Sequence, residues 1–316
     1  MTKPSVIAIA GATGSGKSAL AMTLAKRLGG EIICMDSMQI YRRMDIGTAK
    51  PTPQERREIP HHMLDIVEPT EAYAVADYAR EAEGVIGDVW ARGRLPLLVG
   101  GTGLYLKTLM HGLSLGGAKS DEKLRQRLNA IADTPNGRET LHTMLEKADP
   151  DAARRLHPND VRRVVRALEI YELTGVPMSK QPREEAQRPF RVLPLALTMP
   201  RPALYERLER RVHEMMRVGL LDEVRGLLES GVSPQAQAMQ GIGYKELVSV
   251  AQGMDSIEEA VRQIILHTRH YAKRQETWLR TEPAVVWLDA LSTDTSEEAL
   301  RMAERFLAEN ERNGSL

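Results

Sequence analysis

The chain of 316 residues is long enough for about two domains, and 42% of its residues are hydrophobic, so it can bury a substantial core. Its 43 Lys and Arg residues balance 43 Asp and Glu residues, which excludes a uniformly basic nucleic-acid coat protein but permits local basic surfaces. A single cysteine, Cys34, excludes an intramolecular disulfide, and no apolar run approaches the ~18–20 residues of a membrane span. Because the first residues have no signal-peptide character, we expect a cytoplasmic protein.

Strand and helix patterns alternate in the first third of the chain. The run VIAIA is continuously apolar, which is typical of a strand buried on both faces of a parallel sheet. Leucines at every fourth position then predict a helix that ends at a pair of glycines. The order predicts a parallel α/β sheet flanked by crossover helices. The predicted elements are strands over 6–10, 31–35 and 95–99, helices over 18–28 and 71–92, and a long loop over 36–69.

The pattern changes between residues 119 and 185, where arginine-rich helices and turns replace strand signals. RVLPLALT at 191–198 predicts one more strand, and the chain from Pro202 onward is mostly helical. We therefore expect a phosphate-loop α/β core with a helical insertion domain. Its predicted parts are 1–118 (first part of the core), 119–185 (insertion) and 186–316 (remainder of the core).

The segment GATGSGKS fits the pattern G-x-x-x-x-G-K-[ST] in full and stands between a predicted strand and a predicted helix, as this motif requires. Its glycines let backbone amides turn inward, and the following helix N-terminus adds positive potential for a polyphosphate. Lys17 supplies a cation and Ser18 a hydroxyl for Mg²⁺. Nucleotide- and ATP-binding proteins share this motif, which by itself does not separate a nucleotide from another diphosphate. The candidate phosphate-binding residues are Gly11, Ala12, Thr13, Gly14, Ser15, Gly16, Lys17 and Ser18.

Two further segments directly follow predicted strands, and ligands collect at the carboxyl ends of parallel strands. In DSMQIY (36–41), Asp36 could accept a proton from an attacking nucleophile, with helix or loop capping as the alternative. In GGTGLY (100–105), the glycines allow close backbone approach to a ligand and Thr102 offers a short polar group. Close packing of strand and helix explains these glycines equally well.

The long loop contains DIGTAKP at 45–51 and HHMLD at 61–65. Adjacent His61 and His62 could suggest a metal, but neighbours in an extended segment point to opposite sides. No further His or Cys cluster is near in the sequence. We interpret both segments as loop scaffolding.

Two basic segments interrupt the neutral average, at 154–166 and 267–280. On a helix, Arg162 and Arg166 lie one turn apart, so such a segment can present a cationic stripe to an RNA backbone. Tyr271 or Trp278 could stack on a base. A solvated helix face is the alternative interpretation of each stripe.

Taken together and in this order, GATGSGKS, DSMQIY, DIGTAKP, HHMLD and GGTGLY closely resemble the bacterial tRNA dimethylallyltransferases (tRNA isopentenyltransferases). Segments 156–175, 241–247 and 268–280 are similar to the same family, so the resemblance covers nearly the whole chain. It implies transfer of a dimethylallyl group from dimethylallyl diphosphate to N6 of adenosine 37 in tRNA, with Mg²⁺ present, by a monomer. From the motifs alone, a P-loop kinase of a nucleoside or small alcohol is the main alternative, and a non-catalytic RNA-binding NTPase has no feature of its own.

The resemblance also implies roles for single residues. Asp36 would take the proton from, or orient, the adenine amine, and Thr13 and Thr102 would bond near the reacting centre. Arg211 would reach the diphosphate, although three arginines of the same segment (Arg207, Arg210 and Arg217) are close in sequence. The implied contacts with the anticodon stem-loop are Asp36, Ser37, Met38, Gln39, Thr102, Arg125, Arg162, Arg163, Val164, Val165 and Arg166, with Gln240, Lys245, Arg269, Lys273 and Arg274 as further candidates.

Overall fold

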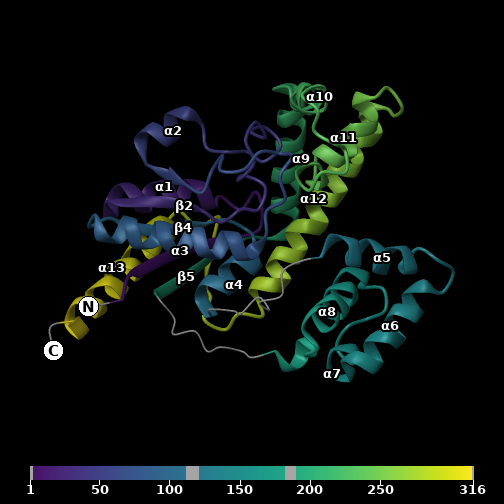
Figure 1. Cartoon of the computed structure of the whole chain (residues 1–316). Helices are drawn as coiled ribbons and strands as arrows, with labels where there is room; N and C mark the ends of the chain where they lie inside the picture. Colours follow the sequence, from purple (N-terminus) through teal and green to yellow (C-terminus); the bar gives the residue numbers. More distant parts are fainter. Residues whose placement is uncertain (1–2, 112–120, 182–189, 315–316) are drawn as a thin grey trace. The chain divides into compact units, whose positions relative to one another are not determined.

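A computed structural model describes residues 3–111, 121–181 and 190–314. The chain divides into two compact units, of which the first comprises Met1–His111 and Gln187–Leu316 and the second Gly112–Ala186 (Figure 1). The second unit interrupts the first in sequence, whereas the predicted boundaries at 118 and 185 lie outside the described residues. Within the residues that the structure describes, no helix has the length and apolar character needed to cross a membrane.

The described part of the first unit contains one sheet of six parallel strands in the order β3-β2-β4-β1-β5-β6. The predicted parallel α/β fold is therefore confirmed. The strand after the insertion, β5, lies between β1 and β6 and pairs with β1 along the whole length of β1. Two short edge strands, β3 and β6, were not predicted. The strands are β1 (Ser5–Gly11), β2 (Gly30–Cys34), β3 (His61–His62), β4 (Leu95–Val99), β5 (Arg191–Thr198) and β6 (Val286–Asp289).

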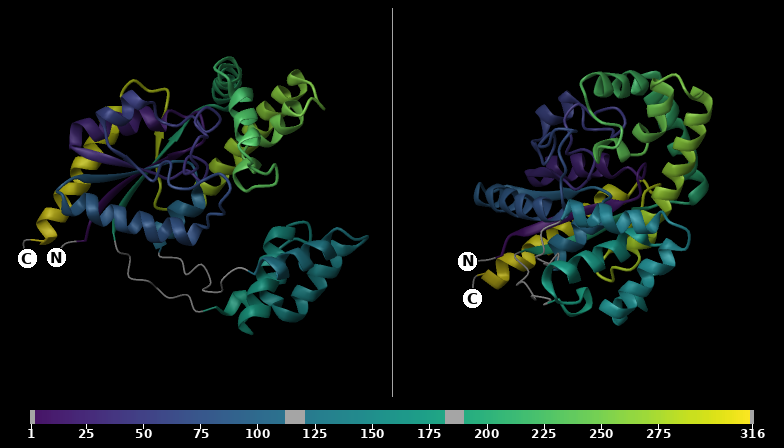
Figure 2. Two further views of the ribbon diagram at one scale, coloured as in Figure 1. Left: turned by 45° about the horizontal axis from the view of Figure 1, so that its top comes forward. Right: turned by 45° about the vertical axis from the view of Figure 1, so that its right-hand side comes forward.

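Alternate residues of β1 belong to two different hydrophobic cores, one on each face of the sheet. Ile7 and Ile9 pack with α1 (Lys17–Leu28) and α13 (Thr295–Gly314). Val6 and Ala8 pack on the other face, with α3 (Val75–Ala91) and α4 (Gly103–His111), and the two views of Figure 2 show helices on both sides of the sheet. The continuous apolar run of this strand is thus explained by burial on both faces.

Four further helices extend the core beyond the carboxyl edge of the sheet. They are α9 (Arg201–Arg217), α10 (Leu220–Glu229), α11 (Tyr244–Ala251) and α12 (Ile257–Leu279), with the short helix η2 (Ala238–Gln240) before α11. α12 packs against α9, α11, α4 and β1, so one face of this long helix lies over the strand ends. The predicted loop over 36–69 contains a short helix, α2 (Pro53–Glu58), which begins with a capping box at Thr52 and Glu55.

The described part of the second unit is a helical bundle with a small aliphatic core. Leu128, Leu141, Leu145 and Leu168 are buried at its centre. Its elements are α5 (Glu122–Ala132), α6 (Gly137–Ala148), α7 (Pro150–Ala153), α8 (Val161–Thr174) and η1 (Met178–Lys180). The structure therefore agrees with the predicted helical character of this part of the chain.

Candidate active site

The phosphate loop joins β1 to the N-terminus of α1, and its backbone requires glycine. Gly11, Gly14 and Gly16 have φ angles of 141°, 78° and 97°. A Cβ on Gly11 would lie 2.8 Å from the carbonyl oxygen of Leu197 in β5, so this turn presses against the neighbouring strand. The loop thereby holds its amides at the first turn of α1, where the helix dipole favours an anion.

Lys17 lies at the first position of α1 and turns back toward the loop. Its ammonium donates a hydrogen bond to the carbonyl oxygen of Ala12 at 2.7 Å. Loss of hydration lowers the pKa of Lys17 to about 8, with Asp36 opposing this shift and Arg211 adding to it. The structure therefore brings these three charged residues within electrostatic reach of one another.

Arg211 of α9 is the arginine that the structure connects to this site. Burial lowers its pKa, and the carboxylate of Asp36 opposes that shift. By contrast, Arg217 forms a surface ion pair with Glu214 at 2.6 Å, and Arg210 is exposed. Among the neighbouring arginines that the sequence left open, Arg211 is thus the one on which the charge of Asp36 acts.

Asp36 follows β2 at the carboxyl edge of the sheet. Its Oδ1 accepts a hydrogen bond from the amide of Met38 at 2.9 Å, so the capping interpretation holds for this oxygen. Its Oδ2 has no hydrogen-bond partner among the described residues. The amide of Ser37 donates to Oγ1 of Thr102 at 3.1 Å, which joins the end of β2 to the loop after β4. In half-buried Asp36, Oδ2 is therefore available to accept a hydrogen bond or a proton from a ligand.

The glycines of GGTG are explained by close packing. A Cβ on Gly100 would lie 2.0 Å from the carbonyl oxygen of Met35, and one on Gly101 would lie 2.0 Å from Nε2 of Gln275. A Cβ on Gly103 would lie 2.3 Å from the ring of Trp278. The packing alternative that the sequence left open therefore holds for these three positions.

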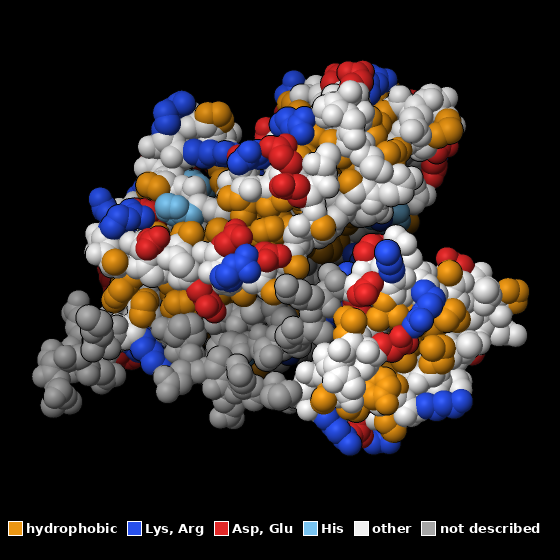
Figure 3. Space-filling model, viewed as in Figure 1, with side chains coloured by type: hydrophobic (Ala, Val, Ile, Leu, Met, Phe, Trp, Pro, Cys, Tyr) orange, Lys and Arg blue, Asp and Glu red, His pale blue; other side chains and the backbone are white. Residues whose placement is uncertain are grey.

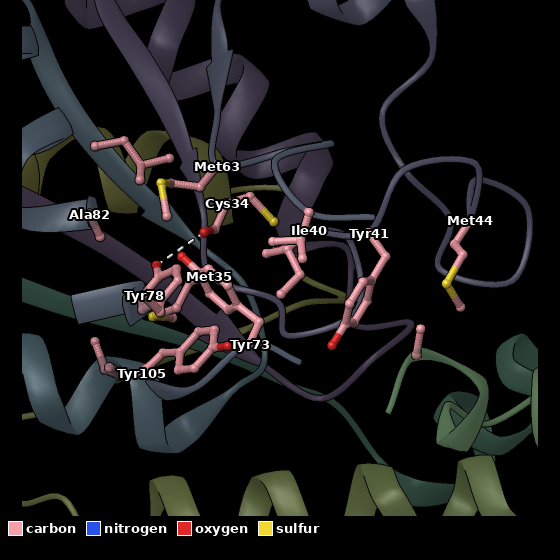
Figure 4. Packing of buried hydrophobic residues seen from close by; sticks show 14 of the residues in the cluster. Cys34, Met35, Ile40, Tyr41, Met44, Met63, Tyr73, Tyr78, Ala82 and Tyr105 are labelled. Carbon is pink, nitrogen blue, oxygen red and sulfur yellow. Dashed lines mark hydrogen bonds between the residues drawn. The ribbon is translucent and has the colours of Figure 1, made fainter. Parts of the chain in front are cut away.

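A cluster of tyrosines supports the strand end that carries Asp36. Tyr78 of α3 stacks on Tyr105 of α4 with ring centres 3.7 Å apart, and its hydroxyl donates to the carbonyl oxygen of Cys34 at 3.0 Å (Figure 4). Tyr73 and Tyr41 lie in the same core. Burial raises the pKa of the Cys34 thiol. This packing fixes the backbone just before Asp36.

The motifs DIGTAKP and HHMLD form a scaffold of ion pairs, as predicted. Buried Lys50 binds Asp65 at 2.5 Å and Asp45 at 2.9 Å, and Arg56 binds Asp65 at 2.7 Å. Burial alone would raise the pKa of Asp65, but hydrogen bonds from these two cations outweigh it and lower that pKa. His62 binds buried Glu31 at 2.6 Å, and no group of three or more His, Cys, Asp or Glu in the described parts of the chain could hold a metal.

Two candidate RNA contacts near Asp36 are already engaged within the protein. The amide nitrogen of Gln39 donates to the carbonyl oxygens of Thr48 and Ala49 at 3.0 and 3.2 Å, and its oxygen accepts from the thiol of Cys34. Met38 is half-buried and packs beside Gly241, where a Cβ would lie 2.6 Å from its methyl carbon. Both side chains shape the loop that carries Asp36.

The second basic segment lies on α12, where its side chains separate into two groups. Lys273 and Arg274 are exposed, whereas Arg269 pairs with Glu209 at 2.7 Å and lies over the ring of Tyr205. Gln240 and Lys245 are also exposed. On the visible face of each unit, the basic side chains of the described residues are mixed with acidic ones (Figure 3).

In the second unit, the predicted RNA contacts fall into three groups. Arg162 and Arg163 are exposed near the start of α8. Arg125 and Arg166 both bind the fully buried carboxylate of Glu169, at 2.9 and 2.6 Å. Val164 and Val165 are 0% and 5% exposed in the core of the bundle, and their contact with RNA stays a prediction.

Sequence reasoning missed Gln275, which lies on the inner face of α12 and is 6% exposed. Its amide bonds to Thr13 in the phosphate loop and to Gly101 after β4. Neighbouring Tyr271 interacts with Thr102 and Gln275, and burial raises its pKa. A helical pattern of buried positions could have assigned residues 272, 275, 276 and 279 to an inward face, but not to these partners.

The sequence matches two family models and several proteins of known family. Residues 39–282 match the family model of IPP transferase, and residues 4–69 match that of isopentenyl transferase. The tRNA dimethylallyltransferase of Pelotomaculum thermopropionicum is 50% identical over 288 residues, which cover 90% of this chain and 91% of that protein. The corresponding protein of Geobacillus thermodenitrificans is 46% identical over 302 residues, which cover 95% of both.

Two solved structures give the same result. The tRNA isopentenylpyrophosphate transferase of Bacillus halodurans is 41% identical with a TM-score of 0.74, and the match covers 99% of this chain and 100% of that one. A eukaryotic dimethylallyltransferase acting on tRNA is 33% identical with a TM-score of 0.82, and the match covers 97% of this chain and 80% of that one. The chain therefore belongs to the IPP transferase family, the family of the tRNA dimethylallyltransferases.

Proposed function

We propose that this chain transfers a dimethylallyl group from dimethylallyl diphosphate to N6 of adenosine 37 in tRNA and releases diphosphate. The observation that carries this proposal is the position of Lys17 after β1 and of Asp36 after β2 at the carboxyl edge of one sheet, where the charge of Asp36 acts on Lys17 and on Arg211. Lys17 and Arg211 thus supply cations for a diphosphate, and Asp36 supplies a carboxylate for an amine, in a chain whose relatives are tRNA dimethylallyltransferases.

The donor diphosphate binds to the phosphate loop in this proposal. Within the segment Thr13–Ser18, the amides of Gly16, Lys17 and Ser18 at the start of α1 stabilise its negative charge, together with the ammonium of Lys17 and the guanidinium of Arg211. The Ser18 hydroxyl at the start of α1 is exposed and has no hydrogen-bond partner among the described residues, so it fits as a ligand of Mg²⁺. Mg²⁺ usually takes few protein ligands beside phosphate oxygens and water, and bound here it would supply further neutralisation of the leaving diphosphate.

The acceptor adenine lies beside Asp36. Its N6 amine forms a bond to the allylic carbon as the bond from that carbon to the diphosphate oxygen breaks. The free Oδ2 of Asp36 accepts the proton that the amine loses, and the electron pair of the broken bond leaves with the diphosphate. Lys17 and Arg211 stabilise the charge that develops there, while Thr13 and Thr102 bond near the reacting centre.

The anticodon stem-loop is the macromolecular partner in this proposal. Exposed arginines on α8, with the exposed side chains of Lys273 and Arg274 on α12, contribute charge for the RNA backbone. Action as a monomer is part of the same proposal. Because tRNA is its substrate, the reaction would take place in the cytoplasm.

The test is prenyl transfer without ATP. The protein is incubated with dimethylallyl diphosphate, Mg²⁺ and an unmodified tRNA transcript, and the nucleosides are separated by mass spectrometry. We expect N6-dimethylallyladenosine, and none from a transcript with guanosine at position 37. Phosphorylation of a nucleoside or small alcohol that requires ATP, with no prenylated product, would overturn the proposal in favour of a kinase.

A further inference from the structure

Gln275 is a buried polar side chain whose two hydrogen-bonding groups are both satisfied by distant backbone. Its Oε1 accepts from the amide of Thr13 at 2.8 Å, and its Nε2 donates to the carbonyl oxygen of Gly101 at 2.9 Å. Burying an amide without partners costs free energy, so these two bonds fix the side chain in one orientation. A residue of α12 thus connects the loop after β1 with the loop after β4.

The bond to Thr13 has a consequence for Lys17. The peptide unit between Ala12 and Thr13 is planar, so fixing its N–H also fixes the direction of its C=O. The carbonyl oxygen of Ala12 on that unit accepts the hydrogen bond from the Lys17 ammonium at 2.7 Å. Gln275 therefore orients the peptide group that positions the cation of the donor site.

The bond to Gly101 has a parallel consequence on the acceptor side. The carbonyl oxygen of Gly101 accepts a hydrogen bond from Nε2 of Gln275. On the same peptide unit, the N–H of Thr102 donates to the carbonyl oxygen of Met35 at 3.3 Å. Oγ1 of Thr102 in turn accepts from the amide of Ser37, next to Asp36. The same glutamine thus supports the loop that is joined to Asp36.

The packing around this bridge leaves little room for another arrangement. A Cβ on Gly101 would lie 2.0 Å from Nε2 of Gln275, so only glycine permits this approach. Ala272, one turn before Gln275 on α12, is 0% exposed. Trp278 on the same helix fills the space that a side chain at Gly103 would need. Close packing on α12 therefore restricts the position of the Gln275 side chain.

We propose that Gln275 is a positioning residue that holds the donor loop and the acceptor loop in register, so that Lys17 and Asp36 act together on the two reactants. This inference rests on the proposed function. Each loop retains its own binding groups when the bridge is lost, so binding of each reactant changes little. The chemical step depends on their relative geometry, and a misplacement of about 1 Å can reduce a rate by about 10²-fold.

The first test is the Gln275→Leu variant in steady-state prenyl transfer. We expect kcat to fall by about 10- to 100-fold, with KM for dimethylallyl diphosphate and for tRNA within about threefold of the wild-type values. Gln263→Leu is the matched control, because Gln263 lies on the same helix and its side chain bonds to Glu259 within it, at 2.8 Å, and to no other described residue. An unchanged kcat, or a rise in one KM at constant kcat, would overturn the positioning role.

The second test, Gln275→Glu, distinguishes positioning from general support of the fold. The introduced carboxylate can accept from Thr13 but repels the carbonyl oxygen of Gly101, whereas the protonated acid satisfies both partners. Tyr271, the adjacent titratable side chain, has a pKa raised by burial and stays neutral at neutral pH. The ratio of variant to wild-type kcat should therefore increase as the pH falls from about 8 to about 6.

A constant ratio across that range would contradict the inference, and this variant decides the question if Gln275→Leu does not fold. The wild-type reaction distinguishes failure of the proposed function from failure of the role of Gln275. If the wild-type protein forms no prenylated tRNA, the proposed function fails; if it does and both variants match it, only the role of Gln275 fails.

Discussion

The strand-end site of the first unit and the arginine-bearing helix of the second unit are built in opposite ways. Around Asp36, backbone groups carry much of the function, glycines leave no spare space, and polar side chains such as Gln275 have fixed partners. On α8, Arg162 and Arg163 project from a small aliphatic core into solvent. Bond making needs groups held within fractions of an ångström, whereas attraction of a polyanion needs charge without exact placement.

The largest effect is expected at Asp36. Asp36→Asn removes the proton acceptor while keeping the shape, so the single-turnover rate should fall by about 10²- to 10⁴-fold. Affinity for tRNA, measured by filter binding, should stay within a few-fold. Asp88→Asn on the exposed side of α3 serves as the control. A parallel loss of affinity and rate would instead make Asp36 an RNA contact.

Two glycines should respond to alanine with opposite signs. Gly100→Ala places a methyl group 2.0 Å from the carbonyl oxygen of Met35, and the free energy of unfolding should fall by about 3 kcal/mol. At Gly87 in α3, an added Cβ would have no atom within 4 Å. Because alanine is a better helix former than glycine, Gly87→Ala should raise the free energy of unfolding by about 0.5–1 kcal/mol. Urea denaturation measures both. Equal tolerance at the two positions would show that the strand-end site is not rigid.

The exposed arginines should act through charge. Replacing both Arg162 and Arg163 by alanine should weaken tRNA binding by about tenfold at physiological salt and reduce the slope of log K against log salt by about 1–2. The KM for dimethylallyl diphosphate should not change. A matched double variant at Arg154 and Arg155 removes the same charge from the same unit. If it has the same effect, binding depends on net charge alone and not on this part of α8.

The smallest effect is a pH dependence at Lys17. Its pKa of about 8 means that the free enzyme loses this cation as the pH rises through that value. The ratio kcat/KM for the donor, which reports on the free enzyme, should therefore fall severalfold between about pH 7 and about pH 9. Lys17→Arg keeps the charge and should flatten the profile, at a lower rate. A flat wild-type profile to alkaline pH would show that hydration of Lys17 is greater than we infer.

The sequence predicted those features of the fold and site that depend on residues adjacent in the chain. The buried run of β1, the turn glycines and the position of Asp36 after β2 each depend on a few adjacent residues. The two-residue strand β3 has too little sequence for a periodic signal. Gln275 was missed because its partners lie 262 and 174 residues away. The burial of Val164 and Val165 was not foreseen, because a motif shows family membership but not which side of a helix faces the core.

The pairing of β1 with β5 has a consequence for biosynthesis. β1 leaves the ribosome early, but its neighbour on one side ends at Thr198, after the whole helical unit has been translated. Contacts within the helical unit are closer in sequence and can form without waiting for distant chain. During translation the inserted bundle can therefore fold before the sheet that surrounds it is complete, and the central strand spends that interval with one edge unpaired.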